Sequence, residues 1–465
     1  MSAEVINPLY VPDPPEHLSL FESFAVMRDN YMSAWTANAY REPYVVNKVL
    51  GTLFIIVTKP EYIKHILLDN ADNYIKSPMQ QTTLVPFVGN GLIASEGDFW
   101  RRQRRIAQPA FHHKRLVSFA DAMVAATEDM LVRWQPYAGT GKPLDVWAEM
   151  THVTLDIISR TMFGAGLGDD EVQLVRDCFA VISEDLGTPP YQDLLGLPSW
   201  IPRLVSRRAK KAIRDLRALI EKIIAARHTE GPGKHGDLLD MLLEARDEET
   251  GEGMTDEQLR DEVITIFIAG HETTANGLTW AWYVLSELPH IERKLAEEVC
   301  GVLKGRSPTF EDLKSMPYNK MVFDETIRMY PPAPAFLRKA IGPDKIGDLE
   351  IPAGAEITFA PWITHHHQAL WDKPNEFIPE RFTPENSKGR HKYAYFPFGG
   401  GSRICIGNSF ALMEAQLIMA TVVQKYRLEL VPGHPVVPQS KITLRPRHGL
   451  KMTIEPQTAM AEAAD

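Results

Sequence analysis

Apolar residues recur at the three- and four-residue spacing of amphipathic helices along most of this chain, and the pattern predicts a mainly helical protein. Proline and glycine interrupt it in two apolar stretches. We expect Ser77–Ser95 to be irregular, and Gly187–Pro202 reads either as a lid over a pocket or as a packed connection. The expected helices are Pro60–Asp69, Asp98–Arg105, Leu116–Trp134, Val146–Met162, Glu171–Asp185, Ser206–Arg227, Thr255–Leu288, Pro317–Tyr330 and Phe410–Val423.

Strand-like sequence forms a smaller share of the chain. Tyr44–Val57 is rich in Val, Ile and Phe with Gly51 near its middle, which predicts a pair of strands. Shorter strand-like pieces occur at Phe336–Ala340 and Ala355–Ala360, and again near the end of the chain, at 428–431 and 442–454. The fold class is therefore mainly α with a minor β region, centred on about 40–60 and 336–360.

The longest expected helix begins at a capping box, Thr255-Asp256-Glu257-Gln258, and continues until Pro289 ends it. About thirty residues at ~1.5 Å each make a rod of roughly 45 Å, enough to cross the whole molecule. Gly270 lies in its middle, where a glycine costs about 1 kcal/mol relative to alanine. Such a glycine is often tolerated where a partner approaches the backbone closely. The polar run His271-Glu272-Thr273-Thr274 follows, and it fits either a ligand groove or a buried polar patch.

Composition narrows the class of protein. The 465 residues carry a formal net charge of −10, which argues against general nucleic-acid binding. Three widely spaced cysteines give no disulfide framework and suit a reducing compartment. The Pro-rich N-terminus shows neither a signal peptide nor a membrane anchor. We therefore expect a soluble, cytoplasmic protein.

One cysteine occupies an unusual setting. Phe396–Gly407 reads Phe-Pro-Phe-Gly-Gly-Gly-Ser-Arg-Ile-Cys-Ile-Gly, with Cys405 leading into an expected helix. The positive end of a helix favours a thiolate, which is both a strong nucleophile and a metal ligand. From these residues alone, a small buried hydrophobe remains equally open. A phosphate-binding loop fits less well, because no Gly-Lys-Ser/Thr follows the glycines.

Further pairs of residues have helical spacing. Glu325 and Arg328 lie three apart, and Trp100 and Arg104 lie four apart within a basic run. The adjacent histidines His365-His366-His367 and His112-His113 are expected not to bind metal, since neighbouring loop positions rarely converge on one ion.

Taken together, these motifs resemble the cytochrome P450 family. Phe398-x-x-Gly401-x-Arg403-x-Cys405-x-Gly407 is similar to the family's haem-binding loop. The other matching motifs, in the family's order, are Trp100-x-x-x-Arg104, Ala-Gly-His-Glu-Thr-Thr in the long helix, Glu325-x-x-Arg328 and Pro379-Glu380-Arg381-Phe382. The resemblance implies one haem-thiolate domain over 1–465 with no fused reductase. Haem would lie between the long central helix and the cysteine-loop helix.

The resemblance also implies a role for each matched residue. Cys405 would be the axial ligand of the iron in haem b, with Phe398 packed beside it. Thr273 and Glu272 would organise protons for oxygen activation. Glu325, Arg328 and Arg381 would form a buried structural network. The remaining cofactor-binding residues would be Gly270 on the distal face and Arg403, Trp100, Arg104 and Arg338 at the propionates.

The implied activity is a monooxygenase that inserts one oxygen atom of O2 into a C–H bond of a lipophilic substrate. A fatty acid or alkyl chain, a terpenoid and a steroid all fit the apolar segments expected around the pocket, namely 84–93, 187–202, 267–273, 333–336 and a turn near Ile442. Electrons would come from a separate ferredoxin and its NAD(P)H-dependent reductase. The ferredoxin would dock on a basic surface of Arg101, Arg102, Arg105 and Lys114. A peroxide-driven member of the family and a non-catalytic haem protein are the alternatives, and we expect a monomer.

Overall fold

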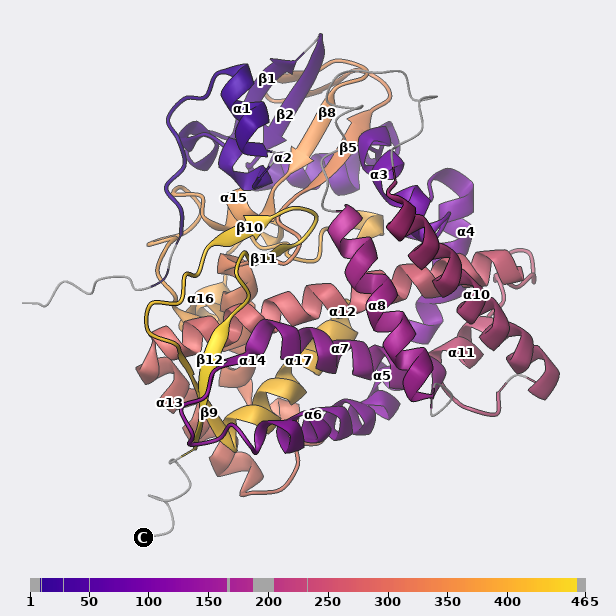
Figure 1. Cartoon of the computed structure of the whole chain (residues 1–465). Helices are drawn as coiled ribbons and strands as arrows, with labels where there is room; N and C mark the ends of the chain where they lie inside the picture. The colour runs from indigo at the N-terminus through magenta and orange to yellow at the C-terminus, as the bar shows by residue number, and fades with distance from the viewer. Residues whose placement is uncertain are drawn as a thin grey trace, which may run out of the picture.

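Helix α12 (Asp256–Glu287) runs through the middle of the molecule and packs against α7 (Val146–Phe163), α14 (Pro317–Met329) and α17 (Asn408–Val423) (Figure 1). Its N-terminus carries the predicted capping box, in which Thr255 and Gln258 exchange side-chain-to-backbone hydrogen bonds. Pro289 begins the next helix, so α12 ends where the sequence predicts.

The computed structural model describes residues 9, 11–27, 29–49, 51–164, 168–186, 205–231 and 233–457. The candidate lid Gly187–Pro202 lies outside them. Within the described part, no helix combines the length and apolar character needed to cross a membrane. The other helices are α1 (Leu20–Met27), α2 (Pro60–Lys64), α3 (Pro78–Val88), α4 (Gly97–Ala107), α5 (His113–Leu116), α6 (Ala120–Trp134), α8 (Asp169–Leu186), α10 (Arg207–Glu230), α11 (Leu238–Glu244), α13 (Pro289–Leu303), α15 (Pro361–His365) and α16 (Pro384–Ser387).

The main sheet lies at one end of the molecule, above the helices in the view of Figure 1. Its strand order is β1-β2-β8-β5-β3, in which β2 and β8 are parallel and the other neighbours antiparallel. Its inner residues form an apolar cluster of their own, separate from the helical core. The strands are β1 (Tyr44–Val49), β2 (Thr52–Val57), β3 (Tyr74–Lys76), β5 (Phe336–Ala340) and β8 (Glu356–Phe359).

Smaller sheets of two or three strands complete the fold. The hairpin β10–β11 joins Pro438–Ser440 to Leu444–Pro446, and its turn, 441–443, reaches the cavity described below. The remaining strands are β4 (Leu144–Asp145), β6 (Asp344–Ile346), β7 (Leu349–Ile351), β9 (Tyr426–Leu430) and β12 (Lys451–Pro456). The predicted class, mainly helical with a minor sheet, is confirmed.

Three local predictions were wrong. The stretch expected to be irregular contains α3, because Pro78 occupies the first helical turn, where proline is compatible, and Gly89 ends the helix. The helix expected from Leu116 begins only at Ala120, after a tight turn at 117–119. His365 belongs to a helix rather than a loop and is fully buried.

Candidate active site

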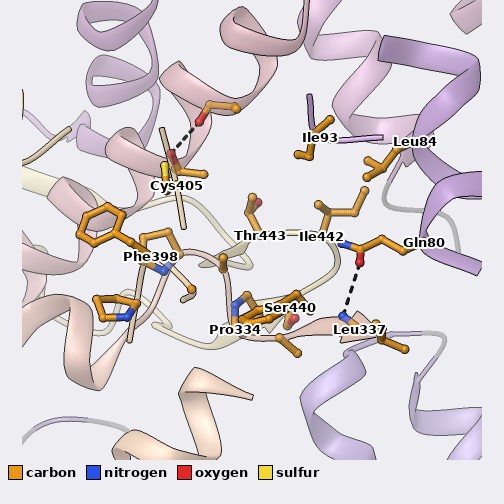
Figure 2. Close-up of a pocket in the computed structure, with 18 of the residues that line it drawn as sticks. Gln80, Leu84, Ile93, Pro334, Leu337, Phe398, Cys405, Ser440, Ile442 and Thr443 are labelled. Carbon is orange, nitrogen blue, oxygen red and sulfur yellow. Dashed lines mark hydrogen bonds between the residues drawn. The ribbon is translucent and has the colours of Figure 1, made fainter. Parts of the chain in front are cut away.

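A cavity of about 920 Å³ lies between α12, the cysteine loop and the sheet. This volume is near the upper end of the range of about 300–1,000 Å³ for small-molecule sites. Figure 2 shows Cys405 and Phe398 on one side of the cavity and Leu84 and Ile93 on the other. Every residue predicted for catalysis or cofactor binding lines it, namely Trp100, Arg104, Gly270, Glu272, Thr273, Arg338, Phe398, Arg403 and Cys405.

The cysteine loop is fixed by its backbone. The amide of Cys405 donates to the carbonyl oxygen of Phe398 across 2.9 Å. Gly401 has a φ of +66°, and the first carbon of any side chain there would overlap the carbonyl oxygen of Leu67. Only glycine satisfies both conditions at this position. The loop is therefore seated on the segment just after α2, and Cys405 is held at the cavity wall.

The ionisation of Cys405 reflects two opposing influences. Burial raises the pKa of the thiol, while a hydrogen bond from the amide of Gly407 and the charge of Arg104 lower it. Burial is the largest of these influences on the protein alone, while the amide at the start of α17 acts in the predicted direction and lowers the pKa. The residue's accessible surface opens onto the internal cavity. A metal ion bound there would deprotonate the sulfur outright.

Buried cations surround one edge of the cavity. The guanidinium of Arg403 lies 4.0 Å from the centre of the Trp100 ring and contacts Glu96. Burial lowers the pKa of both Arg403 and Arg338 to about 10. Nη1 of Arg403 and Nε of Arg104 are buried and have no hydrogen-bond partner among the described residues. The edge has more buried positive charge than the neighbouring carboxylates balance.

Lys76, which sequence reasoning missed, belongs to the same edge. Its register partner in the sheet is Arg338, and burial, Arg403 and Arg338 together lower its pKa to about 6. Its ammonium donates to the carbonyl oxygens of Leu92 (2.6 Å) and Ser95 (2.7 Å). A single lysine in a short strand carries no local signal of this kind, because the other cations reach it only through the fold.

These observations test the fit of the expected cofactor. Haem has two propionate carboxylates, and charged groups buried without partners are costly. The four cations Lys76, Arg104, Arg338 and Arg403 fit that pair of anions, and the sulfur of Cys405 lines the same cavity. Among the described residues, no group of three or more His, Cys, Asp and Glu side chains is arranged to hold a metal ion.

The central helix supplies the polar groups opposite. Thr273 Oγ1 donates to the carbonyl oxygen of Ala269 (2.7 Å), and Thr274 does so to Gly270 (3.2 Å). Glu272 Oε1 accepts a hydrogen bond from the hydroxyl of Thr443 in the hairpin turn (2.6 Å). Thr443 is a second residue that sequence reasoning missed. Gly270 has only ordinary clearance from Ile158, so none of the residues that the structure describes is the close partner expected at this glycine.

The predicted pocket segments are confirmed in part, and the segment 187–202 lies outside the described residues. Leu84, Leu92, Ile93, 268–270 and 333–336 line the cavity, as does Ile442. Phe267 does not, because its ring stacks on Phe163 and Phe179 inside the helical core.

The predicted structural network is also present. Arg328 donates to both oxygens of Glu325 (2.7 and 2.8 Å), and Arg381 donates to the same carboxylate (3.2 Å). None of these residues lines the cavity. His365 joins the network because Arg328 donates to its carbonyl oxygen (2.7 Å), and its ring accepts from the amide of Phe396 (3.1 Å).

The expected docking surface on α4 is already partly neutralised. Arg105 pairs with Asp247 and Glu249, both at 2.9 Å, and Arg102 pairs with Glu252 at 3.4 Å. Arg101 pairs with Asp98 on its own helix. The four acidic side chains lower the net positive charge of this surface.

Known proteins resemble this chain in sequence and in fold. A profile of the cytochrome P450 family matches residues 12–454. Cyclooctatin synthase from Streptomyces melanosporofaciens is 34% identical over 398 residues, covering 86% of this chain and 85% of the relative. Cyclooctat-9-en-7-ol 5-monooxygenase from the same organism is 35% identical over 346 residues, 74% of each chain. The crystal structure of the cytochrome P450DA heme domain has a TM-score of 0.81 at 26% identity, covering 96% of this chain and 98% of that one.

Proposed function

The chain belongs to the cytochrome P450 family and is a monooxygenase with a haem-thiolate cofactor, and we propose that it hydroxylates a neutral, ring-containing lipophile such as a terpenoid or steroid. The observation that carries this proposal is the division of one cavity. Its cationic edge and Cys405 suit haem, and its far wall is apolar.

In this proposal Cys405 would bind the haem iron through its sulfur, to which the amide of Gly407 donates. Arg403, Arg338, Arg104 and Lys76 hold the two propionates of haem b, with Trp100 and Phe398 packed against the group. When bound, the haem supplies activation of O2, so that two electrons and two protons yield water and an oxygenated substrate. The protein residues position the substrate and manage the protons.

Proton management falls to Glu272 and Thr273. The side chain of Glu272 would take up a proton from water and release it again to water inside the cavity, and its contact with Thr443 holds it beside the cavity. Thr273 returns its hydroxyl to the helix backbone, which leaves the oxygen as an acceptor on the cavity wall. Members that use peroxide replace this acid–threonine pair, so we favour the O2-dependent reaction.

The relatives support the choice of substrate class. One of the Streptomyces proteins is named for a cyclic alcohol, cyclooctat-9-en-7-ol. A fatty acid is the second candidate, because Lys48 and Lys441 also line the cavity and offer charge to a carboxylate.

We also propose the redox partners, the oligomeric state and the cellular location of the protein. A ferredoxin with its reductase supplies electrons, and it has to compete with Glu249 and Glu252 for the cations of α4. We further propose a cytoplasmic monomer in which residues 1–465 form one haem domain.

The test is substrate-dependent consumption of NADPH and O2 with a reconstituted ferredoxin chain. We expect terpenoids or steroids to accelerate consumption and to yield hydroxylated products. If no organic compound accelerates turnover, the protein is a non-catalytic haem protein. If hydrogen peroxide alone supports product formation at the same rate, the peroxide-driven alternative is correct.

Cys405→Ala is the control for the cofactor assignment. The reduced carbon monoxide complex of the variant should lose the absorption band typical of thiolate ligation. An unchanged spectrum would show that another residue binds the iron.

A further inference from the structure

Gln80 places a hydrogen-bond donor on the apolar side of the cavity. It lies on α3, and its side-chain oxygen accepts a hydrogen bond from the backbone amide of Leu337 in β5, at 3.4 Å. Figure 2 shows Gln80 across the pocket from Cys405, with Ile442 beside it. The side chain therefore bridges two elements and reaches the cavity from the wall opposite the cysteine.

The bridge fixes which end of the amide faces the cavity. A backbone N–H is a donor only, so the oxygen of Gln80 must be the atom turned toward Leu337. The NH2 group is then directed away from β5, and no acceptor for it exists among the described residues. Gln80 lines the cavity, so this group is available to a bound molecule.

Apolar side chains lie on the same side of the cavity as Gln80. They are Leu84, Ile93, Leu337 and Ile442. Lys48 and Lys441 also line the cavity, and they would attract an anionic group rather than a neutral one. A neutral donor beside aliphatic side chains suits a neutral acceptor, such as a hydroxyl or carbonyl oxygen.

We propose that Gln80 forms a subsite for an oxygen atom that the substrate already carries before this protein oxidises it. The substrate class is then an alcohol or ketone with a rigid lipophilic skeleton. This inference rests on the proposed monooxygenase function and deepens it. The Gln80-bound oxygen takes no part in the reaction, in which a C–H bond elsewhere becomes C–OH.

The NH2 group of Gln80 favours oxygenated ligands mainly because a ligand without an acceptor pays a free-energy cost on binding. A hydrocarbon of the same shape has to displace water from the NH2 group and leaves it buried without a partner. Sites built to bind a polar group reject analogues that lack it more strongly than apolar pockets reject extra methyl groups. We expect the oxygenated ligand to bind roughly tenfold more tightly than its parent hydrocarbon.

The subsite also implies that another enzymatic reaction precedes this one. An enzyme that acts earlier must have introduced the first oxygen, by oxygenating a C–H bond or by adding water to a carbocation or alkene. Because that oxygen is held at the wall opposite Cys405, the second oxidation falls on a carbon far from the first.

The experiment compares three matched ligands, 5α-androstane, 5α-androstan-3β-ol and 5α-androstan-3-one, on the haem-loaded protein. Binding is measured from the haem spectral shift and independently by calorimetry. Gln80→Leu should bring the three dissociation constants within about twofold of one another. Gln80→Glu turns the donor into an acceptor, so it should retain the alcohol, which can donate, and lose the ketone, which cannot.

Gln81→Met is the matched control. The amide of Gln81 donates to the carbonyl oxygen of Ala94 (2.9 Å) and the residue does not line the cavity, so the ligand preference should not change. The proposal is overturned if wild type binds all three ligands alike, or if Gln80→Leu weakens all three equally. A ketone that binds Gln80→Glu as well as it binds wild type has the same consequence. Binding without any turnover would instead contradict the proposed monooxygenase function and leave the subsite standing.

Discussion

Two clusters of basic side chains in the interior of this protein differ in how their charges are balanced. In the first, Arg328 is fully buried and donates to Glu325 and to the carbonyl oxygens of His365, Pro374 and Glu376. In the second, Arg403, Arg338, Arg104 and Lys76 share the edge of a cavity, where Glu96 contacts Arg403.

The difference separates a structural role from a binding role. In the first cluster every guanidinium nitrogen of Arg328 has a protein acceptor, so nothing remains for a ligand to supply. In the second, buried nitrogens lack partners among the described residues, and the pKa values of the cations are depressed. That pattern is what a bound anion would relieve.

The largest effect is expected from breaking the balanced cluster. Arg328→Met leaves the carboxylate of Glu325 buried with Arg381 as its remaining charged partner, which should cost about 3–5 kcal/mol of unfolding free energy. Chemical denaturation measures the loss. The double variant Glu325→Gln/Arg328→Met should recover a large part of it. If both variants are equally unstable, the ion pair does not account for the cost.

Beside the second cluster, Glu262 on α12 lies near Lys76 and should make stability depend on pH. Burial raises the pKa of this carboxyl to about 8, and it accepts a hydrogen bond from the amide of Leu92. The folded protein therefore retains a proton that the unfolded chain releases above about pH 4.5, and stability falls as pH rises from about 4.5 to 8. Glu262→Gln should match wild type near pH 5 and exceed it by on the order of 3 kcal/mol near pH 8.

Denaturation at a series of pH values provides the measurement. Parallel stability curves for wild type and Glu262→Gln would show that the carboxyl is ionised in the folded protein throughout this range.

Removing one cation of the second cluster should weaken haem retention more than folding. Arg338→Met removes a charged hydrogen-bond donor, about 2 kcal/mol, so transfer of haem to an acceptor protein should be roughly 30-fold faster. Arg390→Met is the control, because Arg390 lies over Trp371 outside the cavity. Equal haem loss from both variants would contradict the assignment of Arg338 to a propionate.

The smallest effect is expected at the hairpin. Thr443→Val removes the hydroxyl that donates to Glu272 while keeping its shape, and a single neutral donor contributes about 1 kcal/mol or less. We expect two- to fivefold more peroxide per NADPH consumed, with substrate binding unchanged and Thr443→Ser behaving as wild type. A variant with fully coupled turnover would mean that the carboxylate needs no support from the hairpin.

Local signals were sufficient for much of the fold. The capping box at Thr255 and the stop at Pro289 define α12 without any tertiary information. The strand pair around Gly51 has a similar basis, because the glycine adopts a φ of +90° between two apolar runs. The sequence interpretation missed α3 because it treated every proline as a helix breaker. Pro78 lies in the first turn of the helix, where proline is compatible with helical structure.

The residues of the site also divide into those that a local motif identifies and those that only the fold brings together. Cys405 and Arg403 belong to a dense local motif, so sequence identifies them. Lys76, Gln80 and Thr443 matter only because β3, α3 and the hairpin meet at one cavity, and no short-range pattern marks such residues. The charge balance of the α4 surface was missed for the same reason, since Asp247 is far away in the chain.

The close packing of Gly401 against the backbone carbonyl of Leu67 has a consequence for mutant libraries. A saturation library at position 401 should yield almost no coloured colonies, because any side chain would push the loop off its backbone support. The lack of coloured colonies would carry no information about chemistry at the iron. A library at Ile442, which is 39% exposed on the hairpin turn, should remain coloured and differ in the compounds it accepts.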